Sequence, residues 1–168
     1  MQVTTTMIDF FGEFAYLGQS PVSAAAAQED YLFTLSSRGL YGLTAVLELG
    51  LRADTGPIQI KEIAAAHGIP QHYLEQILVA LKKGGLVQSF RGNQGGYALN
   101  GRADQLRVYD VLACLEGELE VAPGVSGASR LGFYMTNIQK AIYRELDITI
   151  ADLMQQYQES QQAFNYSI

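Results

Sequence analysis

Apolar side chains recur three or four residues apart in several segments of this chain, and each such segment predicts an amphipathic helix. The first segment follows Ser36 and Ser37, either of which can cap a helix. Its regularly spaced apolar positions are Leu40, Leu43, Leu47 and Leu51. The cluster at 54–57, which contains Gly56 and Pro57, ends this helix.

Residues 58–99 predict two short helices followed by a β-hairpin. One helix covers 61–67, and a second runs from Pro70 to about Lys83, where Gly84 and Gly85 stop it. The inward positions of the second helix are Leu74, Ile77, Leu78 and Leu81. Strands at 86–90 and 97–99 flank a glycine-rich loop. The expected fold is therefore mainly α with a small β-hairpin, a winged helix-turn-helix.

The C-terminal third predicts three more helices. Residues 106–116 form one, with Val108, Val111, Leu112 and Leu115 inward, and a loop follows at 118–128. A long helix at about 129–146 carries an apolar stripe of Leu131, Tyr134, Met135, Ile138, Ile142 and Leu146. Because it lies beyond a complete small domain, we expect this stripe to be buried against a second copy of the chain. Thr149 and Asp152 form a capping box for a last helix.

The chain thus divides into five expected parts. Residues 1–34 form an N-terminal extension that is flexible or docks on a partner. Residues 35–117 form the winged helix-turn-helix domain, and 118–128 form a loop. Residues 129–160 hold the dimerisation helix and the C-terminal helix, and the glutamine-rich end fades into a tail at 161–168.

The distribution of charge supports a nucleic-acid partner although the net charge is −6. Residues 36–107 contain eight basic and five acidic side chains, whereas 108–168 contain three basic and eight acidic ones. Attraction to phosphate is local, because salt screens it beyond roughly 8–10 Å. The positive charge therefore lies in the segment that predicts a winged helix.

The remaining composition favours an intracellular, cytoplasmic protein. One cysteine excludes an internal disulfide framework. No lysine or arginine precedes Arg38, which argues against a secretory signal and an arginine-rich transit peptide. No apolar run approaches the ~20 residues that span a bilayer, so no membrane partner is expected.

The outward face of the second helix carries chemistry suited to double-stranded DNA. Gln71 and Gln76 can address adenine edges, and Glu75 can accept from cytosine N4 while it repels phosphates and the acceptor groups of bases. Lys82 and Lys83 suit phosphates. The alternative is an ordinary solvated helix face, which the neighbouring hairpin makes less favourable.

The hairpin loop supplies a second contact. Arg91 suits a narrow minor groove, whose negative potential attracts a guanidinium. Gly92, Gly95 and Gly96 are expected to permit positive φ and a narrow tip. A phosphate-cradling loop is rejected, since the loop lacks a following Lys-Ser/Thr and does not open a helix.

Several motifs resemble the family of bacterial IscR, NsrR and CymR transcription regulators. They include Tyr-Leu-Glu-Gln at 73–76, Arg-Gly-Asn-Gln-Gly-Gly-Tyr at 91–97 and Leu-Glu-Gly at 115–117, and the resemblance covers about 35–155. It implies a homodimer on a palindromic operator, with Glu75 discriminating bases and Arg91 in the minor groove. The expected DNA-binding residues are Ser37, Gln71, His72, Tyr73, Glu75, Gln76, Lys82, Lys83, Arg91, Gly92, Gly95 and Gly96.

The chain departs from the cluster-binding members of that family, which carry three cysteines after the Leu-Glu-Gly helix. Here residues 118–129 contain neither cysteine nor histidine, so an iron–sulfur cluster and other cofactors are not expected. Cys114 is interpreted as an inert buried thiol, with redox sensing as the alternative. His67, His72 and the acidic run from Glu116 are expected at the surface rather than as metal ligands.

Three hypotheses follow from the sequence. The favoured one is a dimeric DNA-binding transcription regulator that responds to a small molecule, a partner protein or no ligand; a redox-responsive regulator with a non-standard effector site is an alternative to it. The second uses the winged helix to bind protein. The third, an enzyme, lacks a nucleophile–base pair, metal spacing or cofactor loop.

Overall fold

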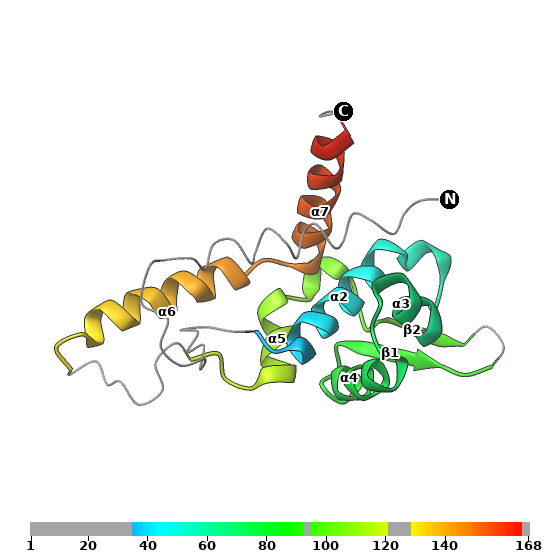
Figure 1. Ribbon diagram of the computed structural model, residues 1–168, viewed down its shortest axis with the longest axis horizontal. Helices are drawn as coiled ribbons and strands as arrows, with labels where there is room; N and C mark the ends of the chain where they lie inside the picture. The colour runs from blue at the N-terminus through cyan, green and yellow to red at the C-terminus, as the bar shows by residue number, and fades with distance from the viewer. Residues whose placement is uncertain (1–34, 93–94, 121–128, 166–168) are drawn as a thin grey trace, which may run out of the picture. The chain divides into compact units, whose positions relative to one another are not determined.

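The computed structural model describes residues 35–92, 95–120 and 129–165 (Figure 1). The expected N-terminal extension at 1–34 and the end of the tail lie outside these residues. The described elements are α2 (Ser37–Leu51), a 3-10 turn (Ala53–Thr55), α3 (Ile60–His67), α4 (Gln71–Lys83), β1 (Val87–Phe90), β2 (Gly96–Leu99), a second 3-10 turn (Ala103–Gln105), α5 (Val108–Glu116), α6 (Gly132–Leu146) and α7 (Ile150–Asn165). The fold is mostly helical with a two-stranded antiparallel hairpin, as predicted.

Helix α2 begins as expected but buries a different face. The Ser36 hydroxyl accepts from the backbone N–H groups of Arg38 (3.1 Å) and Gly39 (3.3 Å). The regularly spaced leucines of α2 are only half-buried. The buried positions are Gly39, Gly42, Ala45, Val46, Leu49 and Gly50. A Cβ on Gly42 would overlap the Leu115 side chain of α5, so the small residues let α5 pack closely against α2.

In α4 and α5, the apolar positions that the sequence predicted to face inward are the buried ones. The four inward positions of α4, Leu74, Ile77, Leu78 and Leu81, are buried. The four of α5, Val108, Val111, Leu112 and Leu115, are buried as well. All eight belong to one apolar core, because α2 contacts both α4 and α5.

The hairpin, hereafter the wing (residues 87–99), gains a third backbone partner. Val87 pairs with Leu99 at its base and Phe90 with Gly96 near its tip. Ile58, which precedes α3, forms an isolated antiparallel bridge with Tyr97. The wing is therefore attached through β2 to the segment that precedes α3.

The expected role of the wing glycines needs correction. Gly92 has a φ of 106°, as predicted, but Gly95 and Gly96 are not among the glycines with positive φ. A Cβ on Gly96 would overlap the backbone carbonyl of Ile58, and one on Gly95 would lie 2.5 Å from the carbonyl oxygen of Phe90. Close backbone approach, rather than φ, explains glycine at these two positions.

Helix α7 belongs to the core of the winged-helix domain. Thr149 and Asp152 form the predicted capping box, in which the Asp152 N–H donates to the Thr149 hydroxyl at 3.1 Å. Ile150 is fully buried, and its N–H donates to the Leu106 carbonyl at 2.8 Å. Helix α7, which the sequence grouped with the dimerisation helix in 129–160, thus packs on the winged-helix domain. The helix also continues to Asn165, into the segment expected as a tail.

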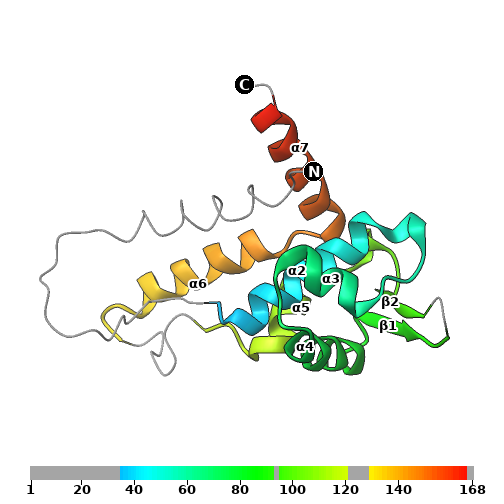
Figure 2. The ribbon, with the colours of Figure 1, turned by 45° about the vertical axis from the view of Figure 1, so that its right-hand side comes forward.

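Helix α6 begins at Gly132, three residues later than expected. Figure 2 shows it on the side of α2 and α5 away from the wing. Tyr143 packs edge-to-face against Tyr109 of α5, with ring centroids 5.4 Å apart. In the expected dimerisation stripe, Leu131 is 60% and Tyr134 53% exposed in the single chain, whereas the other four members are half-buried.

Candidate nucleic-acid interface

The outward face of α4 is polar and exposed. Gln71, His72, Glu75 and Gln76 are exposed, opposite the four buried core positions. Val79 continues this face and is 41% exposed. The helix thus presents amide, imidazole and carboxylate groups on a rigid element, as the sequence predicted.

Tyr73 differs from its neighbours on α4 because it is half-buried. Its ring meets Tyr41 of α2 at an interplanar angle of 81°, with centroids 6.1 Å apart. Ser37, the first residue of α2, is exposed one helical turn before Tyr41. The tyrosine pair therefore brings the start of α2 to the N-terminal part of α4.

The wing lies against α4. Arg91 is exposed directly after β1, and its neighbour Phe90 is 45% exposed. Helix α4 contacts β1 of the wing. Burial, and then the negative charge of the Glu75 carboxylate, raise the pKa of the Tyr97 phenol in β2. The sequence did not single out Phe90, because the exposure of this strand residue depends on the fold.

The two lysines that end α4 have different surroundings. Lys82 donates a hydrogen bond from its ammonium group to the hydroxyl of Ser89 in β1. Lys83 is exposed, and no hydrogen bond or ion pair of it is found among the described residues. The sequence alone had predicted the same role, a phosphate contact, for both lysines.

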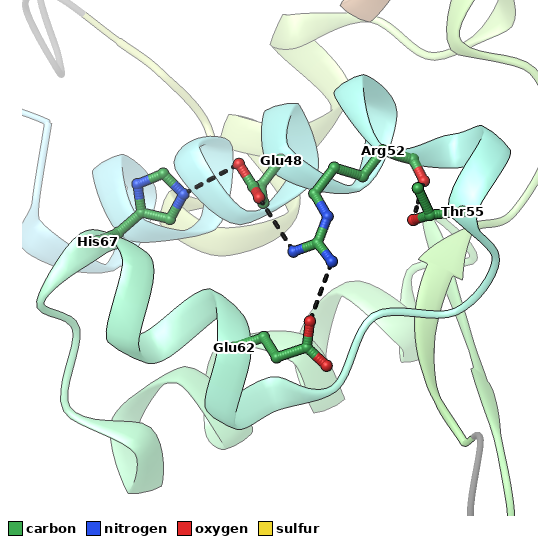
Figure 3. A network of polar contacts seen from close by, with 5 residues as sticks. All are labelled: Glu48, Arg52, Thr55, Glu62 and His67. Atoms are coloured by element: carbon green, nitrogen blue, oxygen red, sulfur yellow. Dashed lines mark hydrogen bonds and ion pairs between the residues drawn. The ribbon is translucent and has the colours of Figure 1, made fainter. Parts of the chain in front are cut away.

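Helix α3 is fixed to α2 by a network of charged side chains (Figure 3). Arg52 of α2 donates to Glu62 of α3 at 3.0 Å and to Glu48 at 3.4 Å. These contacts raise the pKa of Arg52, and the hydrogen bond with Glu62 has the largest effect. His67 Nε2 lies 3.3 Å from Glu48, and its side chain is only 17% exposed. The expectation that His67 is a surface residue is therefore wrong, whereas His72 is exposed.

Glu116 also departs from the sequence-based expectation. Its carboxylate accepts a hydrogen bond from the Ser36 hydroxyl at 2.5 Å and lies over Gly39. A solvated acidic run is thus the wrong description of this residue, which supports the start of α2. Nothing in the local sequence signals a partner eighty positions away.

Cys114 is half-buried under the end of α4. Its thiol lies 3.6 Å from the carbonyl oxygen of Ala80, and a Cβ on Gly84 would lie 2.6 Å from its sulfur. Among the described residues, no three histidine, cysteine or acidic side chains gather as metal ligands. Likewise, no helix among them is long and apolar enough to cross a membrane.

Comparison with known proteins assigns this arrangement to one family. The Rrf2 family, described as "Iron-dependent Transcriptional regulator", matches residues 35–156. CymR of Bacillus subtilis (strain 168) is 34% identical over 131 residues, which cover 76% of this chain and 94% of CymR. IscR of Erwinia tasmaniensis is 33% identical over 125 residues, 71% of this chain and 72% of the relative. These relatives are transcriptional regulators, not enzymes.

Solved structures show the same similarity. The structure of B. subtilis CymR, the global cysteine regulator of that organism, matches with a TM-score of 0.66 at 34% identity and covers 73% of this chain and 96% of CymR. T. potens IscR matches with a TM-score of 0.66 at 34% identity, covering 76% and 90%. Both the sequence and the fold thus point to one family.

Proposed function

Since the chain belongs to the Rrf2 family of transcriptional regulators, we propose that it binds a palindromic operator as a homodimer. The observation that carries this proposal is the exposed polar face of α4 beside an exposed arginine on the wing. A helix of this kind fits the major groove, which is about 12 Å wide, while a wing can follow the backbone to the next minor groove.

The side chains of α4 suggest distinct roles at the operator. Glu75 would accept from a cytosine amino group and exclude bases that present only acceptors, so it serves selectivity more than affinity. Gln71 and Gln76 would form bidentate contacts with adenine. His72 would contact a base edge or a phosphate nearby.

Contacts to the backbone would set the register of the protein on the duplex. Lys83 is a free cation at the end of α4 among the described residues, and Ser37 lies at the positive end of the α2 dipole. Arg91 would enter the minor groove where it is narrow and its potential most negative. Such contacts position the helix without reading the sequence.

The exposed stripe of α6 supports the proposed dimer. A helix of 15 residues is about 22 Å long. Leu131 and Tyr134 of the stripe are 60% and 53% exposed, and its other four members keep part of their apolar surface uncovered. Two copies packed through this stripe would each present one α4, and a two-fold axis between them matches a palindromic operator.

The signal that controls binding is proposed to be something other than an iron–sulfur cluster held by one chain. A cluster needs several thiolates or imidazoles together. The chain has one cysteine and two histidines; His67 is paired with Glu48, His72 lies on the outer face of α4, and Cys114 lies under its end. These donors do not fit a cluster, so we favour a small molecule, a protein partner or the thiol itself.

Selection from random duplexes, followed by titration of the selected sequence at several salt concentrations, tests the proposal. We expect a two-fold symmetric consensus and an affinity that falls steeply with salt, because each neutralised phosphate contributes about −0.9 to the slope of log K against log salt. Sedimentation of the complex should give two chains per duplex. Enrichment of no sequence, or binding that salt does not weaken, would remove this function and favour a winged helix that binds protein.

A further inference from the structure

The outer half of the wing is held from both sides at a single rung of its ladder. Ser89 and Tyr97 are partners in the register of β1 and β2. On the β2 edge, Tyr97 and Ile58 exchange backbone hydrogen bonds of 2.8 and 2.9 Å. On the β1 edge, the Lys82 ammonium donates to the Ser89 hydroxyl at 2.5 Å. A two-stranded hairpin is only marginally stable by itself, so these two attachments matter for its orientation.

Both attachments involve elements of the helix-turn-helix. Ile58 lies two residues before α3, and Lys82 lies in the last turn of α4. Glu75 is seven residues before Lys82, which places the two side chains on the same face of α4, two turns apart. The effect of Glu75 on the Tyr97 phenol agrees with this placement. The C-terminal end of this α4 face therefore contacts β1 at the same rung that Ile58 holds from the β2 edge.

We propose that Lys82 is a positioning residue that fixes the wing against α4, and that it is not one of the phosphate contacts. Arg91 follows Ser89 by two residues, so a fixed rung constrains where the backbone of Arg91 lies. The distance between the base-reading face of α4 and Arg91 is then set within the protein, before DNA is bound. The inference rests on the proposed function, since it concerns how the same interface is assembled.

The adjacent lysine provides a matched control. Lys82 and Lys83 carry the same charge and end the same helix, but only Lys82 reaches the wing. A phosphate role predicts similar behaviour for the two residues. A positioning role predicts that Lys82 behaves like Ser89, which has no charge.

The first test measures the wing without DNA. Amide hydrogen exchange across 87–99 is compared between the full chain and the variants Lys82→Gln, Ser89→Ala, Ser89→Thr and Lys83→Gln. We expect about fivefold faster exchange in Lys82→Gln and Ser89→Ala, because each removes one charge-assisted hydrogen bond. Ser89→Thr, which keeps the hydroxyl, and Lys83→Gln should exchange like the unmodified chain. Unchanged exchange in Lys82→Gln overturns the proposal.

The second test measures coupling on the selected operator. Lys82→Gln and Ser89→Ala should each weaken binding about fivefold, and the double variant should bind no more weakly than either, because both break one bond. Lys83→Gln should instead add its full effect to that of Ser89→Ala. Additive effects of Lys82→Gln and Ser89→Ala overturn the proposal. If the unmodified chain selects no operator, the proposed function fails, while the exchange measurement still decides the role of Lys82.

Discussion

Ser36 and Glu116 are joined by a hydrogen bond although eighty positions separate them in the chain. The same Ser36 hydroxyl accepts from two backbone N–H groups that begin α2. The Glu116 carboxylate thus orients the cap and places negative charge near the positive end of the helix dipole. Through this bond, the last residue of α5 fixes the start of α2.

Replacing Ser36 by alanine should lower the free energy of unfolding by about 1 kcal/mol, because two N–H groups lose their acceptor. Ser37→Ala is the matched control, since Ser37 is the exposed first residue of α2 and does not cap it. Urea unfolding of both variants measures the difference. Equal loss in the two variants would contradict the assigned cap.

Arg91→Ala should weaken operator binding by about 1–3 kcal/mol if the guanidinium enters the minor groove. A gel-shift titration at fixed salt measures the effect. Arg130→Ala removes the same charge from an exposed position beside α6 and should change affinity little. An Arg91→Ala variant that binds like the unmodified chain would remove this role.

Glu75→Ala should change the preferred bases more than the affinity, because an acidic side chain rejects wrong bases by repulsion. Repeating the selection from random duplexes should yield a consensus relaxed at the position that Glu75 addresses. Glu159→Gln, which removes an exposed acid from α7, should leave the consensus unchanged. The same consensus with uniformly weaker binding would count against base discrimination by Glu75.

Ile138→Asp should produce monomers in sedimentation velocity, because it places a charge in the α6 stripe that is proposed to be buried between subunits. Phe133→Asp is the control on the same helix. Phe133 is 67% exposed and, at 100° per residue, lies about 140° around the helix from Ile138. It should stay dimeric. A dimeric Ile138→Asp variant would exclude the stripe as the interface.

The capping box predicts a dependence of stability on pH. Hydrogen bonds from Thr149 lower the pKa of Asp152 in the folded chain. The unfolded state therefore binds more protons in this range, so the contribution of Asp152 is complete above its unfolded pKa and is lost as pH falls through the folded one. Thermal unfolding between about pH 6 and pH 3 should show a shallower decline in Tm for Asp152→Asn. A parallel decline in the two proteins would contradict the assigned role.

The elements near α4 could be predicted because their signals are local. A large apolar residue at every inward position, a proline at the start and lysines at the end define α4 within its own sequence. The capping box of Thr149 and Asp152 is equally local and was confirmed. Expectations of this kind need no knowledge of what packs against the helix.

The predictions were wrong where the burial or pairing of a residue depends on an element that is distant in the sequence. In α2 the leucines suggested the buried face, but α5 and α7 approach so closely that glycine and alanine occupy it. The burial of Ile150 and the bond from Ser36 to Glu116 likewise depend on tertiary neighbours. Similarly, the difference between Lys82 and Lys83 requires knowing where Ser89 lies. The roles of Cys114 and the DNA-facing residues stay predictions.

The glycines of α2 have a practical consequence for anyone engineering heat tolerance. Exchanging glycine for alanine within a helix ordinarily raises stability by up to about 1 kcal/mol. Here the added methyl group of Gly42→Ala would strike Leu115, and that of Gly50→Ala would lie 2.8 Å from the Met154 sulfur. Leu115 or Met154 must shift to admit the added methyl group, so the usual gain in stability from this exchange should be reduced or lost in α2.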